Sequence, residues 1–128
     1  MKVFLVDDSP AVIERLDALL QELPGVEVLG SAGDVLDATE SILALRPDAV
    51  VLDLHLRDGS GLDVLKFTKP KRPETIFLVC TNFPYEQYRD KCFQEGASFF
   101  LDKSTEFEKI PDILYALMKS AATVSVKR

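Results

Sequence analysis

The sequence predicts an α/β protein, in which a parallel β-sheet is covered by helices on both faces. Two observations carry this prediction. Short apolar runs alternate five times with segments whose apolar residues recur at helical spacing, and such repeated β-α units form parallel sheets through right-handed crossovers. The third run, DAVVLD at 48–53, is apolar on successive positions, which is typical of a strand buried on both faces.

The first β-α unit has the clearest boundaries. KVFLVD at 2–7 is typical of a strand, and Ser9 and Pro10 are residue types that favour a helix N-cap and the first helical position. Apolar residues then recur at helical spacing as far as the Pro-Gly pair at 24–25, which ends the helix. VEVLGSA at 26–32 alternates in character, so we expect a strand near a sheet edge.

The remaining units follow at regular intervals. A helix is predicted to stop before Pro47, because the residue preceding a proline disfavours helical geometry. Pro111 predicts that the last helix starts late or has an irregular first turn. The further predicted elements are a helix over 34–45, a glycine-containing loop and short helix around 61–68, a strand at 75–81, a helix over 85–95 ended by Gly96, a strand at 98–102 and a helix over about 106–120.

Composition is that of one soluble globular domain. The chain has 128 residues, 47% hydrophobic and 28% charged, which is enough to bury a single core. A net charge of −6 argues against a direct nucleic-acid interface. The apolar runs are far shorter than the roughly 18 residues of a membrane span, and Asp7 and Asp8 interrupt the first run too early for a signal peptide.

The two cysteines, Cys80 and Cys92, lie in apolar or amphipathic surroundings without metal-ligand spacing. We expect reduced core cysteines, and a disulfide or a redox role is the alternative. Reduced cysteines favour a cytoplasmic location.

Polar side chains follow the ends of four predicted strands. Asp7 and Asp8 end the first strand and Asp53 ends the third, whereas Thr81 ends the fourth and Lys103 follows the fifth. The carboxyl ends of parallel strands share one edge of a sheet, where ligands bind. Three neighbouring carboxylates repel one another unless a cation is bound, and oxygen-only ligands suit Mg²⁺. The sequence therefore predicts a cation site flanked by a hydroxyl and an ammonium group.

Each of these residues also has an ordinary structural explanation. Asp7 and Asp8 could cap the following helix, and Asp53 could simply start a loop. Thr81 is a common residue type in strands, and Lys103 could be a solvated surface side chain. Their convergence on one edge favours the site.

Four motifs occur in order, each at a strand end: VDDSP, VVLDLHLRDGSGLDVL, LVCTN and GASFFLDKS. Together they closely resemble the receiver domain of two-component response regulators, over about residues 1–120. The resemblance implies a flavodoxin-like (βα)5 fold with strand order 2-1-3-4-5. It also implies a receiver domain at 1–120, and residues 121–128 are expected to be a C-terminal tail.

The same resemblance implies a phosphoryl-acceptor site. Asp53 would be the phosphoacceptor, attacking the phosphorus of a phosphohistidine carried by a sensor histidine kinase or a phosphotransfer protein. Thr81 would hydrogen-bond one phosphoryl oxygen and Lys103 would pair with another. Phosphoryl transfer chiefly requires in-line positioning and neutralised oxygens, which these residue types can supply.

The resemblance also implies a Mg²⁺ (or Mn²⁺) site. Asp8, Asp53 and the backbone carbonyl of His55 would hold the ion, and Asp7 would bind it directly or through water. The His55 side chain could be a catalytic base, but we favour a rim residue that modulates the lifetime of the phosphoryl group.

A conformational switch is implied as well. Thr81 would move toward the phosphoryl group and Phe100 would turn inward, while Phe99 faces the other way. The reshaped surface would be formed by the helix at 85–95, the strand at 98–102 and the last helix. It would contact an effector protein or a fused output domain, or form a homodimer.

Three positions depart from the usual family pattern. Asn82 stands where a small residue is common, so it could crowd the site or donate to the phosphoryl group. Ser104 replaces the proline of a Lys-Pro pair that is often cis, and we expect a trans bond because a non-proline cis bond costs about 3 kcal/mol. Arg57 replaces a common proline in the loop after Asp53.

Two other functions stay open. A pseudo-receiver would bind partners without being phosphorylated. Such a domain would typically lack Asp53 or Lys103, and both residues are present here. A Mg²⁺-dependent phosphohydrolase with an aspartyl nucleophile would carry Asp-x-Asp after the first strand, whereas Asp7 and Asp8 are adjacent. We therefore expect a signalling domain and not an enzyme, apart from its own phosphotransfer and autodephosphorylation.

Overall fold

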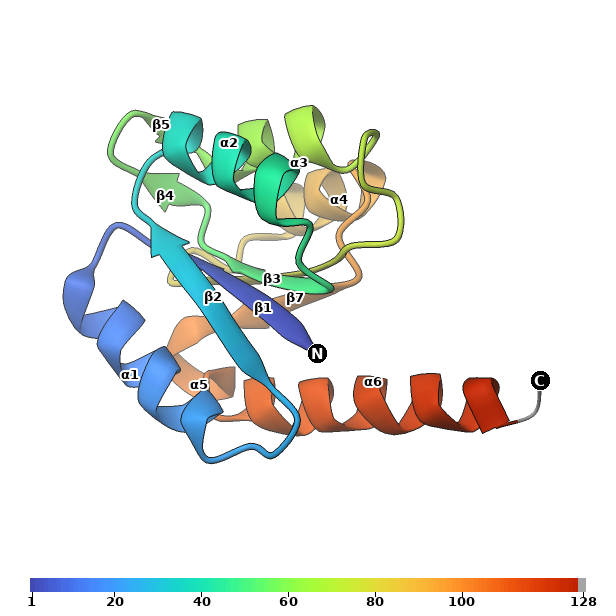
Figure 1. Cartoon of the computed structure of the whole chain (residues 1–128). Coiled ribbons are helices and arrows are strands. Elements are labelled where there is room, and N and C mark those ends of the chain that lie inside the picture. The colour runs from blue at the N-terminus through green and yellow to red at the C-terminus, as the bar shows by residue number, and fades with distance from the viewer. Residues whose placement is uncertain (127–128) are drawn as a thin grey trace.

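The computed structural model describes residues 1–126. Five strands form one parallel sheet in the order β2-β1-β3-β6-β7 (Figure 1). The strands are β1 (Lys2–Val6), β2 (Glu27–Ala32), β3 (Ala49–Leu52), β6 (Ile76–Thr81) and β7 (Phe99–Asp102). When only the five strands of this sheet are numbered along the chain, their order is the predicted 2-1-3-4-5, with the second strand at an edge. The α/β class and the flavodoxin-like strand order are confirmed.

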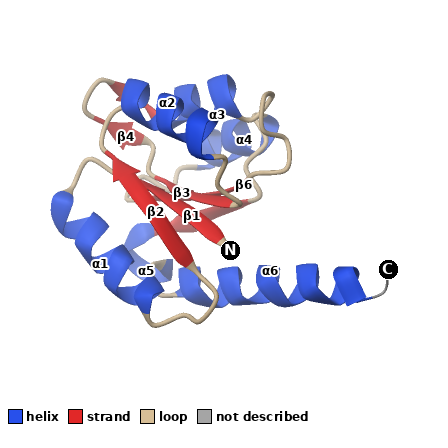
Figure 2. Cartoon of the chain, in the orientation of Figure 1, coloured by secondary structure: helices blue, strands red, loops and turns tan. Residues whose placement is uncertain are grey.

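Helices cover both faces of the sheet (Figure 2). One face carries α1 (Pro10–Gln21), α5 (Lys103–Glu106) and α6 (Lys109–Val126), and the other carries α2 (Val35–Leu45), α3 (Gly61–Thr68) and α4 (Glu86–Gln94). Within residues 1–126, none of these helices is both long and apolar enough to cross a membrane. Because all five strands run parallel, each β-α connection brings the chain back to the same end of the sheet, and the carboxyl ends of the strands meet at one edge.

Side-chain caps fix the starts of the first two helices at that edge. Ser9 accepts a hydrogen bond from the N–H of Val12 at 3.3 Å, with Pro10 as the first helical residue, as predicted. Asp34 accepts from the N–H of Asp37 at 2.8 Å and caps α2. These caps place the β1–α1 and β2–α2 turns close to the strand ends.

The loop after β3 contains a feature that the sequence did not predict. Residues His55–Leu56 (β4) and Gly59–Ser60 (β5) pair as a small antiparallel hairpin. Strands of two residues have no periodicity that a sequence pattern could reveal. The hairpin carries one buried side chain, Leu56, which packs into the core.

The last helical segment is divided. A short α5 begins directly after β7, and α6 begins at Lys109, so the prediction of one helix over 106–120 was wrong in its bounds. Pro111 is the third residue of α6, where a missing N–H costs no helical hydrogen bond. The helix continues to Val126, and residues 127–128 of the expected tail lie outside the described residues. The division into a domain and a tail at residue 120 stays a prediction.

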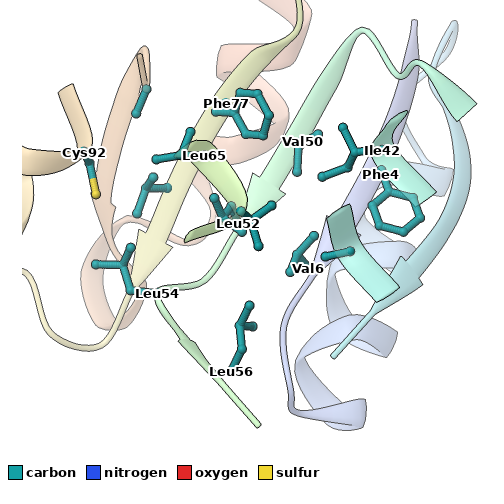
Figure 3. Close-up of a cluster of buried hydrophobic side chains, with 14 of the residues drawn as sticks. Phe4, Val6, Ile42, Val50, Leu52, Leu54, Leu56, Leu65, Phe77 and Cys92 are labelled. Carbon is teal, nitrogen blue, oxygen red and sulfur yellow. The ribbon is translucent and has the colours of Figure 1, made fainter. Parts of the chain in front are cut away.

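The core consists of two clusters, one on each side of the sheet. Along β1, Phe4 and Val6 belong to the cluster under α2, α3 and α4 (Figure 3), whereas Val3 and Leu5 belong to the cluster on the other face. This alternation is the period-two pattern of a strand. All four residues of β3 are buried, as expected for a central strand.

Both cysteines are free and buried, as predicted, and they lie in different core clusters. Burial raises the pKa of the Cys80 thiol to about 12 and that of Cys92 to about 11, from an ordinary 9.0. Desolvation favours the neutral thiol, so neither group is a reactive thiolate near neutral pH.

We predict that these thiols make the fold less stable at alkaline pH. Above pH 9.0 the thiols of the unfolded chain lose protons that the folded chain keeps until about pH 11, so the free energy of unfolding falls over this range. Urea unfolding at pH 8, 9 and 10.5 measures the slope. The Cys80→Ala/Cys92→Ala double variant, less stable overall, should lose part of the slope. An unchanged slope would contradict the prediction.

Candidate functional site

A lysine joins two aspartates at the carboxyl edge of the sheet. Lys103 Nζ lies 2.6 Å from Asp7 Oδ2 and 3.1 Å from Asp53 Oδ2. The three side chains are only 10%, 2% and 9% exposed, respectively. Buried charges persist only when they are paired and hydrogen-bonded. The structure thus brings together three residues that the sequence placed at the ends of β1, β3 and β7.

Backbone donors hold the other oxygen of each aspartate. Asp53 Oδ1 accepts from the N–H of Leu54 at 2.7 Å, and Asp7 Oδ1 accepts from the N–H of Ser9 at 2.9 Å. Each carboxylate is therefore fixed in rotation, with one oxygen turned to Lys103. Asp53 is presented as a buried but oriented group.

The third carboxylate, Asp8, is exposed, and an oxygen of each of Asp7, Asp8 and Asp53 lies within 4.8 Å of the others. Three carboxylates face a single ammonium group, so the cluster carries excess negative charge. Oxygen-only donors fit a hard divalent ion, and the open side at Asp8 suits Mg²⁺, which keeps several waters. His55 begins β4, two residues after Asp53; the role of its carbonyl stays a prediction.

The pKa values of Asp53 and Lys103 are both raised, but for different reasons. Burial raises the pKa of Asp53 and the charge of Asp7 adds to this, although Lys103 and the His55 N–H oppose it. Burial alone would lower the pKa of Lys103, but the hydrogen bonds and charges of Asp7 and Asp53 outweigh burial and raise it. Lys103 is therefore firmly cationic, and a bound cation would favour ionised Asp53.

Thr81 and Asn82 follow at the end of β6. Thr81 is fully buried, and its Oγ1 accepts from the N–H of Phe83 at 3.1 Å. Asn82 is exposed and lines a polar depression of about 470 Å³ together with Lys103 and Arg15. Asn82 thus lies at the rim beside the lysine. Ser104 is in the same depression, and no cis peptide bond occurs within residues 1–126, so the Lys103–Ser104 bond is trans as expected.

The two phenylalanines of β7 face opposite sides of the sheet, as predicted. Phe100 is 7% exposed and packs in the cluster under α2, α3 and α4, whereas Phe99 packs against the other cluster. Phe100 therefore points inward in this structure. Its role as a switch stays a prediction.

An aromatic stack at the rim was missed by the sequence reasoning. The ring of His55 lies on the ring of Phe83, with 4.1 Å between centroids and 22° between planes. Tyr85 and Tyr88 continue the row along α4, and Tyr88 also packs against the core. The sequence carried a signal for this contact. His55 stands two residues after Asp53 and Phe83 two residues after Thr81, and Asp53 and Thr81 lie at the ends of strands that are neighbours in the sheet.

Gly61 lets the loop after β3 close on Asp53. A Cβ at this position would overlap the backbone carbonyl oxygen of Asp53. The Gly61 N–H donates to the carbonyl of Leu54 at 2.9 Å, and Ser60 with Asp63 forms a capping box at the start of α3. Helix α3 therefore begins directly against the backbone of Asp53.

Comparison with known proteins shows the family of the chain. Residues 3–115 match the family model described as "Response regulator receiver domain". The chain belongs to this family. Receiver domains are signalling domains of two-component systems, and phosphoryl acceptance is their general function.

Curated relatives are longer than this receiver chain. It is 36% identical over 116 residues to the sensory transduction protein LytT of Enterococcus faecalis, covering 89% of this chain and 46% of LytT. It is 31% identical over 127 residues to the transcriptional regulatory protein BtsR of Salmonella typhi, covering 98% of this chain and 52% of BtsR. The chain thus spans about half the length of these relatives.

Solved receiver structures share the fold. The response regulator domain of Thermotoga maritima CheB has a TM-score of 0.81 at 25% identity, covering 94% of this chain and 95% of that domain. The signal receiver domain of a Luxo repressor protein from Vibrio parahaemolyticus has a TM-score of 0.85 at 24% identity, covering 99% and 96% of the two chains.

We predict that Gly61→Ala disrupts the receiver site and the fold together. The new methyl group collides with backbone, which cannot swing aside, so the free energy of unfolding should fall by about 2 kcal/mol or more. Thermal or urea unfolding measures the change. Gly33→Ala is the matched control, because the added Cβ meets mainly the mobile end of Arg57. Equal stability of Gly61→Ala and the native chain would refute the collision.

Proposed function

We propose that this receiver domain accepts a phosphoryl group on Asp53 from the phosphohistidine of a sensor histidine kinase or a phosphotransfer protein, with Mg²⁺ as cofactor. One observation carries the proposal: the ammonium of Lys103 lies 3.1 Å from an oriented, buried Asp53 carboxylate, beside two further carboxylates. A nucleophile, a fixed cation and a set of oxygen ligands thus share one edge of the sheet.

The residues divide the reaction between them. An Asp53 oxygen attacks the phosphorus as the bond to the histidine nitrogen breaks, giving an acyl phosphate and a free imidazole. Lys103, already paired with Asp53, neutralises a phosphoryl oxygen. The Thr81 hydroxyl accepts from Phe83, which leaves its own proton to donate to the phosphoryl group. Asn82, at the rim of the site, would modulate access.

The metal would be held by the acidic cluster. Asp7, Asp8 and Asp53 offer carboxylate oxygens, and His55 offers its backbone carbonyl. When bound, Mg²⁺ supplies positive charge beside the transferring group. The His55 ring, stacked on Phe83, would cover one side of the site and modulate the lifetime of the acyl phosphate.

Signalling would use the surface formed by α4, β7 and α6. Thr81 and Phe100 form the proposed switch, since one hydroxyl and one packed ring connect the site to this surface. Tyr85 at the start of α4, Phe93 within α4 and Tyr115 on α6 are exposed aromatic side chains, a residue type favoured at interfaces. The partner would be an effector protein, an output domain of a longer chain or a second copy.

The first experiment is intact mass spectrometry after incubation with Mg²⁺ and acetyl phosphate. We expect one phosphoryl adduct on the native chain. Asp53→Asn and a metal-free sample should show none, because they lack the nucleophile and the cofactor. A native chain that stays unmodified even with a histidine kinase present would favour a pseudo-receiver, and steady release of phosphate from small esters would favour a hydrolase.

Mg²⁺ should also stabilise the fold. An ion at 100 times its Kd adds about 2.7 kcal/mol to the free energy of unfolding, measurable as a rise in Tm. Asp8→Ala should reduce this rise, while its own Tm without Mg²⁺ should not fall, because a like charge has been removed. The exposed Asp90 on α4 provides the control variant, Asp90→Ala. An equal Mg²⁺ response in all three chains would exclude Asp8 as a ligand.

A further inference from the structure

The β4–β5 hairpin is fastened to the start of α2. The Val35 N–H donates to Asp58 Oδ1 at 2.6 Å, and the Arg57 N–H donates to the carbonyl of Gly33 at 3.3 Å. The Arg57 guanidinium also lies 3.6 Å from Asp34. These contacts, named here the hairpin clasp, join the loop after the phosphoacceptor to the β2–α2 turn.

Two glycines lie against the clasp. A Cβ at Gly33 would lie 2.8 Å from the Arg57 guanidinium, and a Cβ at Gly59 would lie 3.1 Å from the Val35 side chain. Both distances are at or below the closest ordinary contacts. Gly59 therefore lets the hairpin approach α2 closely, whereas the neighbour of Gly33 is the flexible end of the Arg57 side chain, which can move aside.

Asp58 is not needed merely to cap the helix. The α2 terminus already has Asp34, which accepts from the N–H of Asp37 at 2.8 Å. Asp58 lies 23 residues away in sequence and adds a second carboxylate to the same helix end. The bond satisfies a helix N–H that Asp34 does not reach and also ties the hairpin to α2.

The hairpin needs such an anchor because it is small. A pair of two-residue strands has little stability of its own, and only Leu56 of the hairpin is buried. His55 opens the hairpin, and its carbonyl is the proposed backbone ligand. Mg²⁺ demands near-ideal ligand geometry, so the position of this carbonyl depends on where the hairpin is held.

We propose that Asp58, through its hydrogen bond to Val35, is a positioning residue for the Mg²⁺ site. This inference rests on the proposed function, because it assumes that the His55 carbonyl is a ligand. Asp58 fixes the hairpin, the hairpin sets the carbonyl, and the carbonyl completes the oxygen ligands from Asp7, Asp8 and Asp53. Mg²⁺ binding and the α2 terminus are thereby coupled.

Calorimetric titration with Mg²⁺ tests the proposal on the full chain. Outer partners of metal ligands commonly change affinity by 10-fold or more, so Asp58→Ala should raise the Mg²⁺ Kd by about tenfold. Asp58→Asn keeps an oxygen acceptor for Val35 and should bind nearly as the native chain. Asp48→Ala is the matched control, since Asp48 also accepts a backbone N–H, from Lys2 at 2.7 Å, at the opposite end of the sheet.

The outcomes distinguish a failure of the proposed Mg²⁺-dependent function from a failure of the positioning role of Asp58. If the native chain binds no Mg²⁺, the proposed function fails at its cofactor. If the native chain binds and Asp58→Ala binds equally well, the positioning role is wrong while the function stands. If Asp58→Asn is weakened as much as Asp58→Ala, the lost charge and not the hydrogen bond is responsible, and the proposal is again overturned.

A measurement on the native chain does not depend on how the variants fold. Coupling is reciprocal, so Mg²⁺ should slow hydrogen exchange at the Val35 amide, whose N–H is held by Asp58. The Lys2 amide, held by Asp48, should not respond. Identical Val35 exchange rates with and without saturating Mg²⁺ would refute the coupling.

Discussion

The bridge from Lys103 to Asp7 and Asp53 is the interaction on which the site depends. One ammonium group, 2.6 and 3.1 Å from two buried carboxylates, links the end of β7 to the ends of β1 and β3. Removing it would leave two like charges buried without a partner, which is far more costly than losing a surface ion pair. The receiver can bury Asp53 because Lys103 offsets its charge.

The bridge in turn depends on the sheet. Lys103 is 96 residues from Asp7 and 50 from Asp53 in sequence, and only parallel strands with regular crossovers bring such distant positions to one edge. This is why the fold and the main site residues could be predicted together. The apolar strand patterns gave the order of elements, and Asp7, Asp53 and Lys103 were identified by standing directly after strands.

Contacts between loops could not be predicted in this way. For the His55–Phe83 stack the sequence offered only the position of each residue shortly after a strand end. The bond between Val35 and Asp58 joins the first residue of α2 to the turn of a hairpin whose two-residue strands have no periodicity. Their geometry is set by where the supporting strands end and by glycines that permit close approach, and neither is visible from residue type alone. Pro111 indicated the late start of the last helix, but the separate α5 was missed because a short helical turn after β7 leaves no pattern of its own.

The charge balance of the site explains why these loops matter. Lys103 compensates buried Asp7 and Asp53 only in part, since burial still raises the pKa of Asp53, and exposed Asp8 adds a further negative charge. The sheet alone therefore builds a site that is short of positive charge. A divalent ion would correct this, but the ion needs ligands beyond the rigid strand ends. In the proposed site the hairpin after Asp53 would supply one through the His55 carbonyl, so the attachment of this hairpin to α2 by Asp58 and Arg57 would bear on metal binding at Asp53.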